Sequence, residues 1–193
     1  MDPRKRRSRD RLYAAALALA AERPLSSLTV TQLADAAGVH RSTFYEHADS
    51  PAGLVEAALT AELDVLRDEL MKDRSDAATA VATVTEGVLR HILRHVDIYR
   101  RELADGGGAL HAMLSRHFRG TTEILLERGR IQLPLSADGV SDSVVSDSAA
   151  RFLADGTVGV IDGWLRHPRP RVEDFLRIYL ALLPDWWPHR PVV

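Results

Sequence analysis

The feature that most constrains the fold is the stretch from residue 29 to residue 47, which predicts two short helices joined at a glycine. Thr29 can cap the start of the first helix, because Gln32, three residues later, can reach back to the amide of the cap residue. Gly38 can adopt the left-handed backbone that ends this helix, and Val39 can fill the corner that follows. The apolar stripe of the first helix repeats at spacings of three and four and consists of Val30, Leu33, Ala34 and Ala37.

The second helix of this pair is expected from about His40 to Glu46, with Phe44 as its main core contact. Arginine suits the major-groove edge of guanine, serine and threonine suit either base type, and tyrosine and histidine suit phosphates. This combination is typical of a helix-turn-helix that reads DNA, whereas a solvated turn of a helical bundle accounts for fewer of its features. The side chains left without a hydrophobic role are His40, Arg41, Ser42, Thr43, Tyr45 and His47.

The same residues resemble the TetR family of bacterial transcriptional repressors. The segments that carry the resemblance are 28–30, 33–34, 37–39 and 42–47, which follow the family pattern in order and without a gap. The resemblance implies that the helix after Gly38 enters the major groove, with Thr31, Arg41 and Thr43 near base edges and with Tyr45 and His47 on phosphates. Thr29 and Gln32, at the start of the preceding helix, and His40 and Ser42 are also expected to contact DNA.

Two positions depart from the family pattern. Ala48 stands where the family usually has an aromatic residue, and Pro51 stands where it usually has a lysine that binds phosphate. Ser50 and Pro51 still predict a sound helix start, with the serine as cap and the proline in the first turn. The departures therefore remove one phosphate contact and leave the expected fold unchanged.

The amino-terminal segment is strongly basic. Residues 1–11 contain six basic and two acidic residues, a local charge of plus four in a chain whose formal net charge is minus two. A basic arm ahead of a helix-turn-helix can lie along the DNA backbone or reach into the minor groove, and its contribution falls with salt. A solubilising tail is the alternative. The arm residues expected at DNA are Arg4, Lys5, Arg6 and Arg7.

This segment also imitates an export signal, because twin arginines precede an alanine-rich apolar run. The run is only weakly hydrophobic, and Leu12, Ala16 and Leu19 share one helical stripe, as in a bundle helix. We therefore expect a helix over residues 8–22 and a cytoplasmic protein. The absence of cysteine excludes disulfides and thiolate metal sites.

The rest of the chain indicates an all-α fold of about nine helices. Its 193 residues are 46% hydrophobic, contain no apolar run of membrane length and show no alternating strand pattern. We expect a DNA-binding domain over residues 1–50 and a helical ligand-binding and dimerisation domain over 51–193, coupled by a long helix from about Ser50 to Met71. Later helices are expected over 77–95, 97–103, 109–130, 143–166 and 172–183, with a break at Gly106-Gly107-Gly108.

The last two expected helices predict a homodimer. Three glycines, Gly156, Gly159 and Gly163, fall on nearly the same face of one helix, which allows another helix to approach closely. The final helix is apolar too far around its circumference for the surface of a monomer. These helices resemble, more loosely, the dimerisation helices of the same family, which implies a palindromic operator. The interface is expected to use those glycines with Val160, Trp164, Phe175, Tyr179 and Leu182.

The region between the DNA-binding and dimerisation helices is where the resemblance places a small-molecule effector, whose chemical class the sequence does not specify. His91 and His95 lie four apart, a spacing that suits a metal, yet no third ligand stands at an obvious spacing, so no metal or cofactor is predicted. Arg94, Arg100 and Arg101 could meet an anionic ligand or only solvent. The expected pocket residues are Leu89, Ile92, Leu93, Met113, Leu114 and Phe118.

These observations favour a sequence-specific transcriptional regulator, a repressor released by a small-molecule inducer that binds between the fourth and eighth helices. One alternative is a DNA-binding regulator that senses no ligand. A helical enzyme is the other, but the sequence has no glycine-rich phosphate loop, nucleophile elbow or set of metal ligands.

Overall fold

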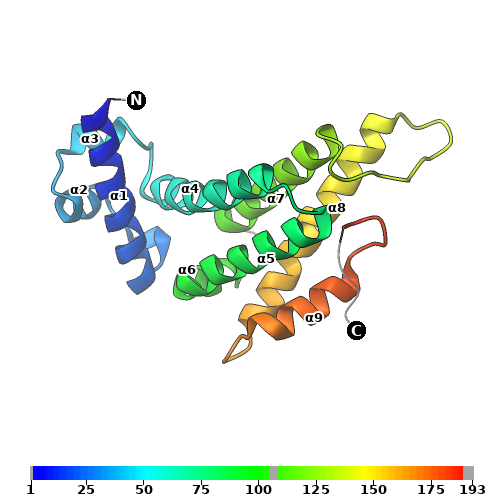
Figure 1. The fold of residues 1–193 in the computed structure, drawn as a ribbon. Coiled ribbons are helices and arrows are strands. Elements are labelled where there is room, and N and C mark those ends of the chain that lie inside the picture. The colour runs from blue at the N-terminus through cyan, green and yellow to red at the C-terminus, as the bar shows by residue number, and fades with distance from the viewer. Residues whose placement is uncertain (1, 105–107, 189–193) are drawn as a thin grey trace.

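The computed structural model describes residues 2–104 and 108–188, in which every element of secondary structure is a helix (Figure 1). The predicted all-α fold is confirmed. Of the glycine triplet expected to break the chain, Gly106 and Gly107 lie outside the described residues. The elements are α1 Pro3–Glu22, η1 Leu25–Ser27, α2 Val30–Ala37, α3 Arg41–Tyr45, α4 Pro51–Lys72, α5 Ala77–Arg94, α6 Val96–Leu103, α7 Ala109–Glu127, α8 Asp142–Leu165 and α9 Val172–Leu182.

The first three helices form a small bundle at one end of the molecule (Figure 1). Helix α1 packs against α2 and α4, and α2 packs against α3. The predicted stripe of α1 is largely confirmed, because Leu12 and Ala16 are fully buried. Leu33 and Phe44 are also fully buried, so one side of each short helix faces the core and the other side is left to solvent.

Helix α4 joins this bundle to the rest of the chain. Ser50 caps it by accepting a hydrogen bond from the amide of Gly53 at 3.1 Å, and Pro51 occupies the first turn, as the sequence predicted. The helix packs against α1 at its start and against α5 and α7 farther along. Three of its buried leucines, Leu54, Leu59 and Leu63, belong to a continuous apolar cluster that runs from Leu12 in α1 to Phe175 in α9. A displacement of α4 would therefore change its packing against α1 at one end and against α5 and α7 at the other.

The remaining helices form a second layered bundle. Helix α7 packs along α8, α6 contacts both of them, and α9 packs on α8 and α5. A second, smaller apolar cluster lies toward the far end of this bundle and includes Leu70, Val81, Leu125 and Trp187. Among the described residues, every helix is too short or too polar to cross a lipid bilayer.

Candidate DNA-binding surface and ligand pocket

The turn between α2 and α3 has the local geometry that the sequence predicts. The Thr29 hydroxyl accepts a hydrogen bond from the amide of Gln32 at 3.3 Å, and the Gln32 side chain accepts one from the Thr29 amide at 3.0 Å, which completes a capping box. Gly38 has φ of 60°, in the left-handed region, and Val39 donates its amide to the carbonyl of Ala34 at 2.9 Å. The start and the end of α2 are thus fixed by local hydrogen bonds.

Helix α3 presents a polar face to solvent. Phe44 is fully buried, and its ring meets Tyr45 edge to face with centroids 5.4 Å apart. Tyr45 is 54% exposed, so its hydroxyl is accessible from solvent. The other expected contact residues are exposed, except that Thr43 and His47 are half-buried; the exposed ones are Thr29, Thr31, Gln32, His40, Arg41 and Ser42.

His47 ties the end of this segment to α1. Its Nε2 lies 2.9 Å from the hydroxyl of Ser8, and Ser8 donates its own proton to the carbonyl of Lys5 at 3.0 Å. The tautomer of the His47 ring determines which of the two groups donates in this contact. Partial burial, followed by the positive charge of Lys5, lowers the pKa of His47. The contact between His47 and Ser8 positions the basic first turns of α1 beside α3.

The basic segment differs from the expected arm. Helix α1 begins at Pro3, so Arg4, Lys5, Arg6 and Arg7 stand exposed on its first two turns. Asp2 caps the helix by accepting from the amide of Arg4 at 2.8 Å, and proline at the first position needs no hydrogen bond. The expectation of a helix from residue 8 was therefore wrong in its start. A rigid helix cannot follow the minor groove as an extended chain does, so these cations are better suited to phosphates.

The outer face of α8 and α9 carries exposed apolar side chains. Phe152 is 74% exposed, Ile178 56% and Leu182 64%. On the same helix as Phe152, a methyl group added at Gly156, Gly159 or Gly163 would meet no atom outside the helix within 4 Å. Within one subunit, therefore, no other part of the described chain packs closely against the three glycines that were expected at an interface.

Three of the side chains expected at that interface point into the subunit instead. Trp164 is buried, donates from Nε1 to the carbonyl of Arg171 at 2.9 Å, and packs edge to face on Phe175 at a centroid distance of 5.3 Å. Phe175 is 1% exposed. Tyr179 lies 3.0 Å from the hydroxyl of Thr157 through its own hydroxyl, and Val160 is half-buried. These aromatic residues join α8 to α9, because together they fill the angle between the two helices.

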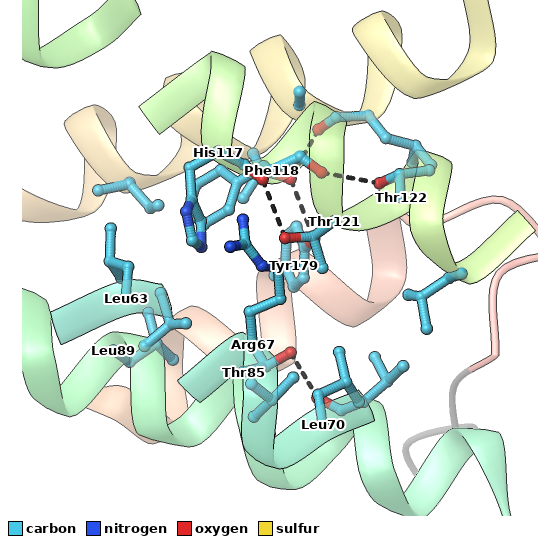
Figure 2. A pocket seen from close by; sticks show the side chains of 18 of the residues that line it. Leu63, Arg67, Leu70, Thr85, Leu89, His117, Phe118, Thr121, Thr122 and Tyr179 are labelled. Atoms are coloured by element: carbon cyan, nitrogen blue, oxygen red, sulfur yellow. Dashed lines mark hydrogen bonds between the residues drawn. The ribbon is translucent and has the colours of Figure 1, made fainter. Parts of the chain in front are cut away.

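A pocket lies between α4, α5, α7, α8 and α9 (Figure 2). Leu89 and Phe118 line it, as predicted. Ile92, Met113 and Leu114 do not, because they are buried in the continuous core, and Leu93 packs against the outside of that core. The space open to the centre of a water molecule is about 90 Å³, enough for a few waters. Further apolar residues of the lining are Leu63, Leu70, Val81, Val84, Val88, Leu125, Leu153, Ala154, Ile161, Phe175 and Trp187.

The polar groups of the pocket converge from α4 and α7. Arg67 extends from α4 toward His117 of α7 (Figure 2) and lies 2.8 Å from the carboxylate of Asp64. His117 Nδ1 is 3.5 Å from the same carboxylate oxygen. Burial, followed by the charge of Arg67, lowers the pKa of His117 to about 4, so the ring is neutral near pH 7. The pocket therefore combines an apolar body with one permanent cation.

Threonines supply further polar atoms of the lining. Thr85, Thr121 and Thr157 donate their hydroxyl protons to the carbonyls of Val81, His117 and Leu153 at 2.7, 2.9 and 2.6 Å, respectively. With their protons engaged within their own helices, these hydroxyls offer lone pairs to a ligand donor.

The structure also reassigns residues that the sequence left ambiguous. Arg100 donates from Nε to the carbonyl of Leu165 at 2.9 Å, and Arg101 donates to the carbonyl of Ala20 at 2.8 Å, so both satisfy helix C-termini rather than facing the pocket. The sequence shows no third ligand at an obvious spacing from His91 and His95, and the fold supplies one from another helix. Glu62 of α4 lies 3.0 Å from both rings.

The sequence interpretation missed Glu62 and Arg67. Both stand on α4 and meet histidines that lie 29 to 50 residues later on other helices, and a charged residue on a long amphipathic helix normally indicates solvent exposure. No signal in the sequence distinguishes them from other exposed charges.

Comparison with known proteins agrees with this geometry. The sequence model of the bacterial regulatory proteins of the tetR family matches residues 12–58, which run from the middle of α1 through α2 and α3 to the first turns of α4. The HTH-type transcriptional repressor KstR2 of Rhodococcus jostii (strain RHA1) is 30% identical over 189 residues, with 92% of this chain and 89% of that protein covered.

Solved structures show the same fold. A TetR transcriptional regulator from Rhodococcus sp. RHA1 superposes with a TM-score of 0.62 at 22% identity, covering 94% of this chain and 98% of that one. FadR from Thermus thermophilus, solved in complex with lauroyl-CoA, gives a TM-score of 0.58 at 20% identity, covering 95% and 100%. The helix-turn-helix, the all-helical architecture and the similarity to KstR2 along nearly the whole chain lead to one conclusion: this chain belongs to the TetR family of transcriptional regulators.

Proposed function

We propose that this regulator is a homodimeric repressor that binds a palindromic operator and leaves it when a small amphipathic molecule enters the pocket. The observation that carries the proposal is the exposed polar face of α3, held by a buried Phe44 and a left-handed Gly38. Such a helix can enter the major groove with Arg41, Ser42 and Thr43 toward base edges. Tyr45, His47 and the basic first turns of α1 would then contact phosphates and fix the register.

Dimerisation is supported by the apolar outer face of α8 and α9. Phe152 on α8 and Ile178 and Leu182 on α9 are large apolar side chains exposed to water, and the glycines on α8 leave room for a close helix approach. A second copy related by a two-fold axis covers each patch with the same patch. The two α3 helices would then face successive major grooves about 34–36 Å apart, so the operator would be an inverted repeat.

The effector is inferred from the pocket lining. Its walls are largely apolar and Arg67 is its permanent cation, which suits a ligand with an apolar body and an anionic group. FadR of Thermus thermophilus is solved with lauroyl-CoA, a molecule of that chemical type. The space in the pocket is small, so such a ligand would push α4 away from α7 and α8, and α4 carries this displacement to α1.

We infer further that the chain acts in the cytoplasm, where the operator is, and that it is a regulator and not an enzyme. Both inferences rest on its membership of a family of transcriptional regulators.

The proposed DNA activity is tested by selecting bound sequences from random duplex DNA with the full chain. We expect enrichment of an inverted repeat, and we expect Arg41→Ala to weaken the enrichment and relax the preference at one base pair while leaving the circular dichroism spectrum unchanged. Failure of the wild-type chain to enrich any duplex at low ionic strength would refute the proposal.

The effector is tested separately by thermal shift against fatty acids and acyl thioesters of increasing chain length. A ligand of the folded form raises the melting temperature by mass action. The variant Arg67→Met keeps the aliphatic part of the side chain and removes the cation, so it should lose most of the shift from anionic ligands. Equal shifts in both proteins would show that Arg67 does not bind the anionic group.

A further inference from the structure

Two histidines of α5 and one carboxylate of α4 meet outside the pocket. His91 Nδ1 and His95 Nε2 each lie 3.0 Å from the same oxygen of Glu62, and the three atoms all lie within 4.8 Å of one another. The His91 side chain is 3% exposed, that of His95 12% and that of Glu62 34%. The cluster is therefore enclosed on the histidine side and open to solvent at the carboxylate.

This set of atoms matches the preferences of zinc and related divalent transition metals. Histidines four residues apart share one face of a helix, and imidazole nitrogen with one carboxylate oxygen is a common donor set for zinc sites that keep a position open. Metal-to-ligand distances of about 2.0–2.1 Å in a tetrahedral site separate ligand atoms by about 3.3 Å. The observed 3.0 Å between Glu62 and each ring therefore has to open by only a few tenths of an ångström.

A partner behind the first histidine supports the same assignment. His91 Nε2 lies 2.8 Å from the hydroxyl of Tyr99, a residue of α6 that is fully buried. Histidines that bind a metal through one nitrogen commonly donate the other ring proton to an acceptor, which fixes the ring orientation. When His91 Nδ1 binds a metal, its Nε2 proton can be donated to the Tyr99 oxygen.

One neighbouring cation has to be accommodated. Arg94 Nη1 lies 3.3 Å from the same Glu62 oxygen, and a bound metal would repel it. The Arg94 side chain is 67% exposed and sits at the surface, so it can turn into solvent when a metal takes its place. An exposed ion pair of this kind contributes little to stability.

We propose that Glu62, His91 and His95 form a binding site for a divalent transition metal of the zinc type, with the fourth position open to water. The three residues are absent from the lining of the pocket, so the site is distinct from the place inferred for the organic effector. A metal here clamps α4 onto α5. Helix α6 continues the connection to the DNA-binding bundle, because Glu102 accepts a hydrogen bond from the amide of Leu25 at 3.0 Å.

The test measures binding of Zn²⁺ and Co²⁺ to untagged, metal-stripped protein by calorimetry and by visible absorption of the cobalt form. We expect one ion per chain, cobalt bands typical of a four-coordinate site and a higher melting temperature with zinc. His95→Gln and Glu62→Gln should each lower the affinity by more than about tenfold, and Tyr99→Phe by a smaller factor. His167→Gln, at an exposed position outside the cluster, serves as the matched control and should bind as the wild type does.

Two results would overturn the proposal. One is that the folded wild-type chain takes up no stoichiometric ion. The other is that His95→Gln and Glu62→Gln, shown to be folded by circular dichroism, bind zinc as tightly as His167→Gln does. Because His95 and Glu62 are partly exposed, both variants should fold even if replacement of the buried His91 does not.

Discussion

Arg11 of α1 donates a hydrogen bond from Nη2 to the carbonyl oxygen of Gly38 at 2.9 Å. This contact joins the first helix to the corner between α2 and α3, so the orientation of the reading helix depends on α1 as well as on α2. Gly38 has φ of 60°, in the left-handed region that favours glycine. The Arg11 side chain also lies close to this position.

Replacing Gly38 with alanine should destabilise the protein by about 1–2 kcal/mol or more. The left-handed backbone costs a side-chain-bearing residue about that amount, and the added Cβ would collide with the Arg11 guanidinium. Urea unfolding monitored by circular dichroism measures the effect. Gly120→Ala is the matched control, because its Cβ would meet no atom within 4 Å, and it should be neutral or stabilising. Equal free energies of unfolding for Gly38→Ala and wild type would contradict this role of the corner.

Arg41 and Tyr45 should differ in how they affect DNA binding. Arg41→Ala should cost about 1–3 kcal/mol on the selected operator and relax the preference for one base pair, because a base contact carries sequence information. Tyr45→Phe removes only a hydroxyl and should weaken binding to all duplexes alike. Fluorescence anisotropy on the operator and on single-base variants separates the two patterns. Parallel losses across all duplexes for both substitutions would refute the division of roles.

A charge placed on the outer face of α8 should separate the subunits. Phe152→Glu puts a carboxylate where the proposed dimer would bury it, and an unpaired buried charge is strongly unfavourable. Sedimentation velocity should show a dimer for the wild type and a monomer for the variant. Leu135→Glu, on a loop where the leucine is 49% exposed, should remain dimeric. The assigned interface is wrong if both variants sediment as the wild type does.

The lowered pKa of His117 predicts that the protein loses stability in mild acid. This pKa is about 4 in the folded chain, below the ordinary value of 6.5, so the unfolded chain binds the proton more readily. The stabilisation is complete above pH 6.5 and is lost as the pH falls toward 4, by about 2 kcal/mol between pH 6.5 and 5. Asp64 favours the charged ring and Arg67 disfavours it. The free energy of unfolding at several pH values, at one protein concentration, measures this slope.

The variant His117→Leu should lower that slope by the contribution of one histidine. His167→Gln, at an exposed position, should retain the full slope. If His117→Leu loses stability with falling pH as steeply as the wild type, then other groups account for the acid sensitivity.

Local sequence signals predicted the local structure well. Thr29 with Gln32, Gly38, and Ser50 with Pro51 each specify a helix end through hydrogen bonds between near neighbours, and each is found as expected. The start of α1 is of the same kind. Asp2 followed by Pro3 is a recognisable cap, but the charge of the basic segment suggested an extended arm, and the capping signal determined the structure.

Long-range relationships could not be read from the sequence. An apolar helix face indicates burial but does not distinguish the interior of a subunit from an interface, and so Trp164 and Phe175 were assigned to the wrong surface. The contacts of Glu62 with His91 and of Arg67 with His117 depend on the packing of α4 against α5 and α7. Only the three-dimensional arrangement brings these residues together.

The central claim is that two α3 helices occupy successive major grooves of one operator. Methylation interference tests it most directly, because dimethyl sulfate modifies guanine at N7, in the major groove that Arg41 would read. On the selected operator we predict two symmetric clusters of interfering guanines with centres one helical turn apart, about 34–36 Å. A single cluster, or interference that Arg41→Ala leaves unchanged, would contradict the account.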